Sequence, residues 1–301
     1  MPFRAVLRLI ALTLATIPLY LGWVLTRPLA WVAPAMDRPL QRLWIGSWAK
    51  ACLWIMGVKA TFEGPVPQGP YFLVANHLSY VDIPLLLARL DARFLAKAEI
   101  AGWPVMGFLA RSTGTLFIDR TRKRDLTRVF PLIRGVLDRG AGVIVFPEGT
   151  STDGSKVERF KPSLFEVPVE MGLEVRCAAL HYHAPVGPLP AWEAVCWWGD
   201  APFAPHFLQF LKQPRTKAVV TFAPQTVGAS GGADGPSTGD GDQRESGNRK
   251  DWAMAAQDTV ERSFTPSRIL PSAPEGTQHP AVGSDLPAQS QPPEAHHDAS
   301  R

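Results

Sequence analysis

Between about Thr61 and Val227, short runs of apolar residues alternate with longer segments that mix apolar and polar residues. The short runs are typical of buried strands, and the mixed segments are typical of helices with one buried face. Strands that alternate with helices predict an α/β fold, in which helices flank a mixed or parallel sheet. The predicted strands lie near residues 71–75, 93–96, 115–118, 142–146 and 174–181, and the predicted helices cover 82–90, 103–111, 125–138 and 162–172.

The N-terminal part has a different hydrophobic pattern, which suits a membrane. Leu9 to Thr26 is a stretch of 18 residues without a charge, preceded by Arg4 and Arg8 and followed by Arg27. This length is enough to cross a bilayer or to enter it deeply. A cleaved signal peptide is the competing interpretation, but no small-x-small cleavage pattern follows the apolar stretch. We therefore expect a retained membrane segment.

A second apolar stretch runs from Leu40 to Val58 and interleaves tryptophans with basic residues. Tryptophan and lysine side chains favour the headgroup layer, so this pattern predicts a helix at the membrane interface. An ordinary helix packed in the protein core is the alternative. Residues 1–60 are thus expected to form a pair of membrane-associated helices.

The composition changes again at Gly228. From there the chain is dense in Gly, Ser, Pro, Gln and acidic residues, and a helix fits only a short segment around Trp252 to Phe264. This composition is typical of disorder, so we expect a disordered tail over residues 228–301 behind a single domain over residues 61–227. The formal charge of +4 combines a basic body with an acidic tail, and a basic body favours anionic lipid or phosphorylated partners.

The segment Asn-His-Leu-Ser-Tyr-Val-Asp over residues 76–82 follows the first predicted strand and leads into a helix. His77 lies where the strand ends, and Asp82 falls in the first turn of the helix. A carboxylate bonded to one imidazole nitrogen fixes the tautomer and lets the other nitrogen accept a proton. The pair therefore suits proton removal from an alcohol. The alternative is structural, with Asp82 placed at a helix N-terminus because the helix dipole favours it there.

Further segments follow in a fixed order. They are Ala-Lys-Ala-Glu-Ile over residues 96–100, Gly-Thr-Leu-Phe-Ile-Asp-Arg over 114–120 and Phe-Pro-Glu-Gly-Thr over 146–150. Together with the histidine motif they resemble the sequence blocks of the glycerolipid acyltransferases, whose signature is HxxxxD. The resemblance covers roughly Leu43 to Leu180. It implies a glycerol-3-phosphate acyltransferase-like fold, with residues 61–227 as the catalytic domain.

The resemblance also implies roles for individual residues. His77 would be the general base, and Asp82 would hold its ring. Arg120 would bind the phosphate of a glycerolipid acceptor bidentately, and Lys97 would add a second charge. Acceptor binding and the shape of the site are associated with the third block, here Glu148, Gly149 and Thr150.

Two positions depart from the family pattern. Ser163 stands where the family usually has glycine, and the stretch from Val175 to Leu180 lacks the proline of the family's fourth block. Because that block is often linked to the acyl donor, the donor type and chain length stay open.

The implied reaction transfers a fatty acyl group from acyl-CoA or acyl carrier protein to the free hydroxyl of lysophosphatidate (1-acyl-sn-glycerol-3-phosphate). The product is phosphatidate, and the enzyme would be a 1-acylglycerol-3-phosphate O-acyltransferase of phospholipid biosynthesis. Its partners would be the lysolipid, the acyl donor and membrane lipids, without nucleic acid, at the cytoplasmic face of the inner membrane. A sibling enzyme for another lysolipid, such as a lyso-aminolipid, and a catalytically silent membrane-binding protein are the alternatives.

The implied chemistry needs no cofactor beyond the acyl donor. Cys177, His181, His183 and Cys196 are grouped in the sequence, but their spacing matches no usual structural zinc pattern. We therefore expect no metal site.

Overall fold

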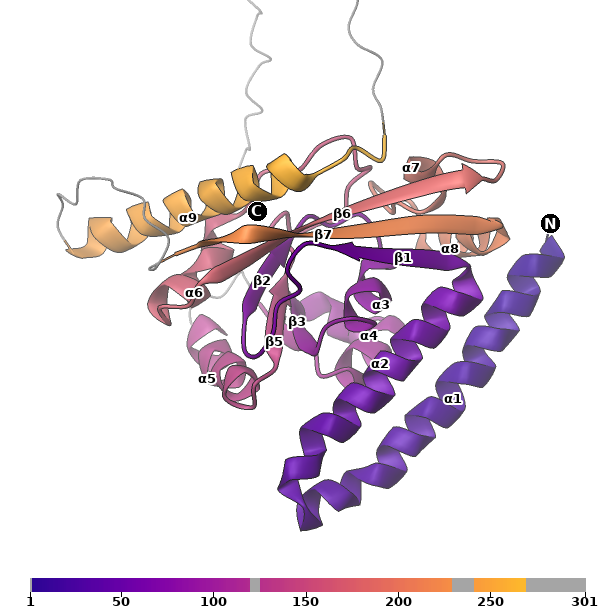
Figure 1. Cartoon of the computed structure of the whole chain (residues 1–301), viewed down its shortest axis with the longest axis horizontal. Helices are drawn as coiled ribbons and strands as arrows, with labels where there is room; N and C mark the ends of the chain where they lie inside the picture. Colours follow the sequence, from indigo (N-terminus) through magenta and orange to yellow (C-terminus); the bar gives the residue numbers. More distant parts are fainter. Residues whose placement is uncertain (1, 120–124, 229–240, 269–301) are drawn as a thin grey trace, which may run out of the picture. The chain divides into compact units, whose positions relative to one another are not determined.

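The computed structural model describes residues 2–119, 125–228 and 241–268, and its centre is a 7-stranded sheet (Figure 1). The strand order is β1-β7-β6-β2-β5-β3-β4. Neighbouring strands pair in parallel except β6 and β7, which are antiparallel, so the sheet is mixed, as predicted. The strands are β1 Val58–Glu63, β2 Phe72–Ala75, β3 Ala92–Lys97, β4 Leu116–Ile118, β5 Gly142–Val145, β6 Val175–Val186 and β7 Arg215–Val227.

Helices cover both faces of the sheet. In β2, Leu73 and Ala75 pack into one apolar cluster, and Phe72 and Val74 pack into the other, because successive side chains of a strand point to opposite faces. The first cluster is covered by α2 Asp37–Met56, α3 Asp82–Leu87, α7 Ala191–Ala194 and α8 Phe203–Lys212, and the second by α5 Asp125–Asp138, α6 Glu166–Glu170 and α9 Gly241–Ser263. The remaining helices are α1 Pro2–Val32 and α4 Met106–Ser112, with short 3₁₀ turns at Pro34–Met36, Ala98–Gly102 and Pro162–Phe165.

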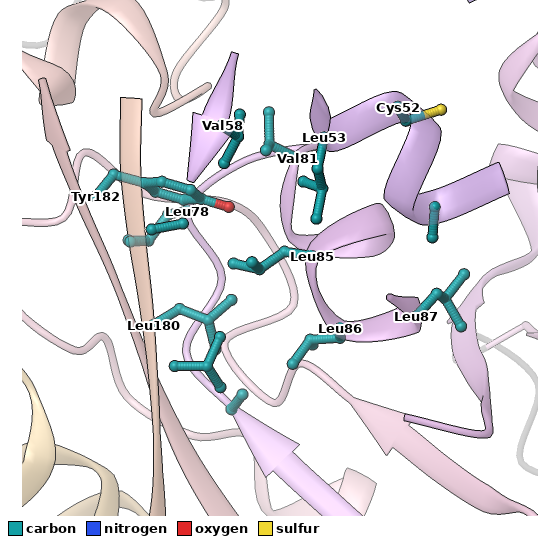
Figure 2. Close-up of a cluster of buried hydrophobic side chains, with 14 of the residues drawn as sticks. Cys52, Leu53, Val58, Leu78, Val81, Leu85, Leu86, Leu87, Leu180 and Tyr182 are labelled. Atoms are coloured by element: carbon teal, nitrogen blue, oxygen red, sulfur yellow. The ribbon is translucent and has the colours of Figure 1, made fainter. Parts of the chain in front are cut away.

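The segment that carries the histidine motif is anchored in the first cluster. Leu78 and Val81 on either side of Ser79 are fully buried, and so is Leu85 on the next turn of α3. Figure 2 shows these side chains beside Tyr182 of β6. Burying several leucine-sized side chains at about 1.5–3 kcal/mol each fixes the position of the loop that holds His77.

The sequence predicted β2 to β6 but not the two strands at the far side of the sheet. β1 begins at Val58, inside the stretch assigned to the second apolar helix, and β7 lies in a segment for which no strand was expected. β7 alternates buried Ala218, Val220 and Phe222 with more exposed neighbours. This alternation becomes recognisable as a strand only when β7 pairs with β1 and β6, because the buried side chains then lie on one face of the sheet.

The expected disordered tail from residue 228, with only a short helix around Trp252 to Phe264, differs from the structure over residues 241–268, where a longer helix forms. α9 lies along the sheet (Figure 1), and its Ala253, Ala256 and Val260 are buried in the second cluster. These three residues recur at helical spacing, but two of them are alanines, which add little to the hydrophobicity of a composition average. Residues 229–240 and 269–301 lie outside the described residues.

The two N-terminal helices form a pair, with α1 packed on α2 and on α8. Phe3–Val32 is long and apolar enough to cross a membrane, and little of its surface is buried in the protein. The start of α1 is nevertheless attached to the rest of the chain. The Arg8 guanidinium donates hydrogen bonds to the carbonyls of Leu211, Gln213 and Pro214 at the end of α8.

Candidate active site

The candidate site lies at the carboxyl ends of β2 and β5, which are parallel neighbours in the sheet. Val74 of β2 stands opposite Val145 of β5, so the segments that follow these two strands leave the same edge together. His77 comes from the first segment and Glu148 from the second. The carboxyl edge of an open α/β sheet is the usual place for a ligand site.

His77 and Asp82 are in direct contact, as the sequence predicted. Nδ1 of His77 lies 2.7 Å from Oδ2 of Asp82, and the Asp82 side chain is fully buried, whereas the His77 side chain keeps 21% of its surface exposed. Since a carboxylate accepts, Nδ1 carries the proton and Nε2 carries the lone pair. Among the described residues, Nε2 has no hydrogen-bond partner. The exposed side of the ring thus offers a base to a bound alcohol.

The Asp82 carboxylate is held by three further donors. Oδ2 accepts the backbone N–H groups of Leu78 at 2.8 Å and Ser79 at 3.0 Å. Oδ1 accepts the hydroxyl of Tyr182 at 2.6 Å. The two amides lie close to the carboxylate because the loop is short, and Asp82 begins α3 only a few residues after His77. With the His77 ring, the carboxylate has four donors, which leave it little freedom to rotate. The His77 ring is fixed with it.

Tyr182 was not predicted as a site residue. It lies on β6, where burial and the nearby Asp82 raise the pKa of its phenol well above the ordinary value, so its hydroxyl remains a donor. The predicted strand over residues 174–181 stopped one residue before it. Alternation along that strand places Tyr182 on the same face as Ala178 and Leu180, but nothing local in the sequence shows that this face meets Asp82.

Glu148 and Thr152 hold the backbone of His77. One Glu148 oxygen accepts the His77 N–H at 2.6 Å, and the other accepts the Glu158 N–H at 2.9 Å. The N–H of Thr152 donates to the His77 carbonyl at 3.0 Å, and the Thr152 hydroxyl donates to it as well. Both polar groups of the His77 peptide are therefore fixed by the loop after β5. Sequence reasoning missed Thr152, which lies just beyond the third block.

The environment of Glu148 differs from that of an exposed carboxylate. Burial raises the pKa of Glu148 to about 8, although its hydrogen bonds from Glu158 and His77 act in the opposite direction. Because each oxygen accepts a backbone amide, the side chain supports the loop, and its role in acceptor binding stays a prediction. Gly149 next to it has a φ of +77°, which a residue with a side chain rarely adopts, and Thr150 is exposed.

Of the two residues predicted to bind an anion, Lys97 and Arg120, the structure describes only Lys97. Lys97 ends β3 and is exposed, at the same carboxyl edge as His77, because Leu95 of β3 stands opposite Val145 of β5. Arg120 lies outside the described residues. The loop of residues 76–82 and Lys97 thus lie at one edge of the sheet. The binding of a phosphate by Arg120 stays a prediction.

Comparison with known proteins agrees with this architecture. A family model described as Acyltransferase matches residues 57–188. The lyso-ornithine lipid O-acyltransferase of Rhodobacter capsulatus is 37% identical over 180 residues, 58% of this chain and 64% of that protein. The 1-acyl-sn-glycerol-3-phosphate acyltransferase of Neisseria gonorrhoeae is 35% identical over 125 residues, 41% of this chain and 49% of that protein. In these two comparisons the chain spans less than two thirds of the relative's length.

A solved structure shares the fold. The crystal structure of the 1-acyl-sn-glycerophosphate acyltransferase PlsC from Thermotoga maritima matches with a TM-score of 0.51 at 19% identity, over 84% of this chain and 97% of that one. The two chains therefore share a fold, a sheet flanked by helices. The chain belongs to the acyltransferase family.

Proposed function

We propose that this protein is an O-acyltransferase that moves a fatty acyl group from a thioester to the free hydroxyl of a membrane lysolipid. The observation that carries the proposal is the 2.7 Å contact between His77 Nδ1 and the buried carboxylate of Asp82, which leaves Nε2 as a base. The family match over residues 57–188 supports the reaction class.

The reaction follows from this geometry. Nε2 of His77 takes the proton of the lysolipid hydroxyl as the oxygen attacks the thioester carbonyl carbon, and Asp82 stabilises the resulting imidazolium. The carbon–oxygen bond forms, the carbon–sulfur bond breaks, and the imidazolium returns its proton to the departing thiolate. Because a thiolate is a good leaving group, the attack is direct and needs no acyl-enzyme. A covalent acyl adduct found by mass spectrometry after incubation with the donor alone would contradict this step.

Two acceptors are candidates. Relatives named lyso-ornithine lipid acyltransferases match over the longer stretch of the chain, which favours lyso-ornithine lipid as the acceptor. Lysophosphatidate is the second candidate, because relatives named for it also match and because Lys97 at the sheet edge suits an anionic headgroup. The donor is acyl-CoA or acyl carrier protein. Since both are made in the cytoplasm, we place the site at the cytoplasmic face of the inner membrane, with α1 and α2 as the attachment.

The test compares wild type with His77→Ala in membranes, with each acceptor paired with each donor. We expect wild type to acylate lyso-ornithine lipid faster than lysophosphatidate, and His77→Ala to lose about two or more orders of magnitude in rate with either acceptor. Faster acylation of lysophosphatidate would reverse the order of acceptors without changing the reaction class. A folded, membrane-bound wild type that is inactive with every pair would favour the silent membrane-binding protein.

A further inference from the structure

The chain after α9 returns to the site. Beyond Ser263, residues 264–268 leave the helix and reach the loop after β5, where the N–H groups of Ser267 and Arg268 donate to the carbonyl of Gly154 at 2.7 and 3.2 Å. Gly154 has a φ of +72°, and a Cβ placed there would lie 2.9 Å from the Cβ of Ser267. The contact is therefore close enough to require glycine. We call residues 265–268 the C-terminal strap.

The strap completes the hydrogen bonding of β6 where β2 ends. Up to Ala178, β6 pairs with the backbone of β2. At Leu180 the Asn76 side chain replaces the strand, accepting from the Leu180 N–H at 2.7 Å and donating to its carbonyl at 3.0 Å. At Tyr182 the Ser267 hydroxyl takes over and accepts the N–H at 3.0 Å. Since buried backbone N–H groups need partners, Ser267 supplies one that the sheet no longer provides.

Arg268 connects the strap to two other segments around the site. Its guanidinium pairs with Asp153 of the loop after β5 and lies over the ring of Trp192, 4.5 Å from the centroid. Burial alone would raise the pKa of Asp153, but hydrogen bonds from Ser155 and Arg268 bring it below the ordinary value. The segment that follows Trp192 also touches the motif, since the N–H of Trp197 donates to the carbonyl of Leu78 at 2.8 Å.

We propose that the C-terminal strap is a positioning element for the acyl transfer, in which Ser267 and Arg268 hold Tyr182 and the loop after β5 in register with the His77–Asp82 pair. Tyr182 reaches the pair through its hydroxyl on Asp82, and the loop reaches it through Thr152 on the His77 carbonyl. The strap thus acts on both partners of the pair through Tyr182 and Thr152. This inference rests on the proposed function for its catalytic consequence, but the alignment of the pair can be measured without a reaction.

The test uses full-length protein carrying Arg268→Ala, Ser267→Ala or both changes, in detergent or native membranes. The matched control is Arg262→Ala, which removes an exposed arginine from the end of α9 whose guanidinium bonds only its helical neighbour Thr259 among the contacts of the described residues. We expect about fivefold to tenfold lower kcat for Arg268→Ala, a larger loss for the double variant and an almost unchanged KM. Arg268→Lys, which keeps the charge opposite Asp153, is expected to recover part of the rate, and Arg262→Ala to match wild type.

A second readout follows the Nδ1–H proton of His77 by NMR of protein labelled with ¹⁵N-histidine, assigned by its absence in His77→Gln. A proton bonded to a buried carboxylate exchanges slowly with water. We expect this signal in wild type and in Arg262→Ala, and its broadening or loss in the double strap variant. If kcat falls only in proportion to the folded fraction while the signal is unchanged, the strap merely stabilises the fold and the proposal is overturned. If wild type is inactive but the signal still depends on the strap, the positioning holds and the proposed function fails instead.

Discussion

Helix α1 and the loop around His77 differ in which side chains they expose and which they bury. α1 exposes large apolar side chains such as Leu14 and Leu25, at 66% and 77%, whereas Asn76 and Asp82 beside His77 are fully buried. The exposed leucines need apolar surroundings that the protein does not supply, and the buried polar groups have their partners inside it. The first region is thus suited to a membrane, and the second to holding the His77–Asp82 pair rigidly. Changes in the two regions should therefore have separable effects.

The largest effect is expected from Asp82→Asn. An asparagine presents an amide to Nδ1, so the ring can carry its proton on Nε2 and lose the base. We expect kcat to fall by roughly 10²–10⁴ while membrane binding is unchanged. Initial rates, normalised to folded protein by circular dichroism, measure the loss. Asp138→Asn, at the exposed end of α5, is the matched control. A rate within threefold of wild type for Asp82→Asn would remove the carboxylate from the mechanism.

Leu14→Lys tests the other region. A lysine in the middle of a membrane-embedded helix costs about 2.5–3.5 kcal/mol, so the protein should partition from membrane to solution by roughly 10² more than wild type. Activity in detergent should stay close to wild type, because Leu14 is exposed. The measurement is flotation with liposomes. Leu132→Lys changes an exposed leucine of α5 and should leave flotation unchanged. Equal flotation of both variants would mean that α1 is not the attachment.

Tyr182→Phe should give a smaller loss within the site. Removing the hydroxyl leaves Oδ1 of Asp82 buried without a donor, which costs about 1–3 kcal/mol, and we expect kcat to fall about tenfold. The matched control is Tyr80→Phe, which removes a hydroxyl bonded to His206 in the aromatic cluster near α8. Steady-state kinetics of the two variants separate support of Asp82 from general packing. Equal losses would show that the Tyr182 hydroxyl has no special connection to the pair.

The last prediction concerns the stability of the fold rather than the rate, through Glu148 and pH. Burial raises the pKa of Glu148 from 4.5 to about 8, so between these values the folded protein binds a proton that the unfolded chain releases. The free energy of unfolding should therefore fall as the pH rises through this window. Glu148→Gln has no such proton. We expect the melting temperature of wild type, relative to Glu148→Gln, to decrease between about pH 5 and pH 8, followed by scanning fluorimetry. A difference that grows with pH would show that the carboxylate is ionised in the folded state.

The local part of the site could be predicted from the sequence. His77 and Asp82 lie five residues apart across one turn, so strand and helix patterns were enough to place them together. The strands β2 to β6 were predicted for a similar reason, since each contains a short, mostly apolar run. Such features depend only on neighbours in the chain.

The rest of the site depends on contacts between distant residues. Tyr182 meets Asp82 across 100 positions, and Glu148 meets His77 across 71, so both require the order and register of strands that no local pattern contains. For the same reason the sequence could not show that both Glu148 oxygens bond backbone amides, and its role in acceptor binding stays a prediction. Only a short helix around Trp252 to Phe264 was expected in the segment that forms α9. Its packing on the sheet was missed because its buried stripe is largely alanine, which packs closely but adds little apolar area.

The attachment of Arg8 to the end of α8 bears on how the chain is made. Its guanidinium bonds carbonyls that lie 203 to 206 positions later, at the turn into β7. During synthesis α1 and α2 therefore leave the ribosome long before the end of α8 exists, with many apolar side chains of α1 uncovered. We expect a bilayer that receives α1 at this stage to cover its apolar side chains, and the long-range closure onto the end of α8 to come late in folding. The membrane would then serve the folding of the chain as well as its attachment.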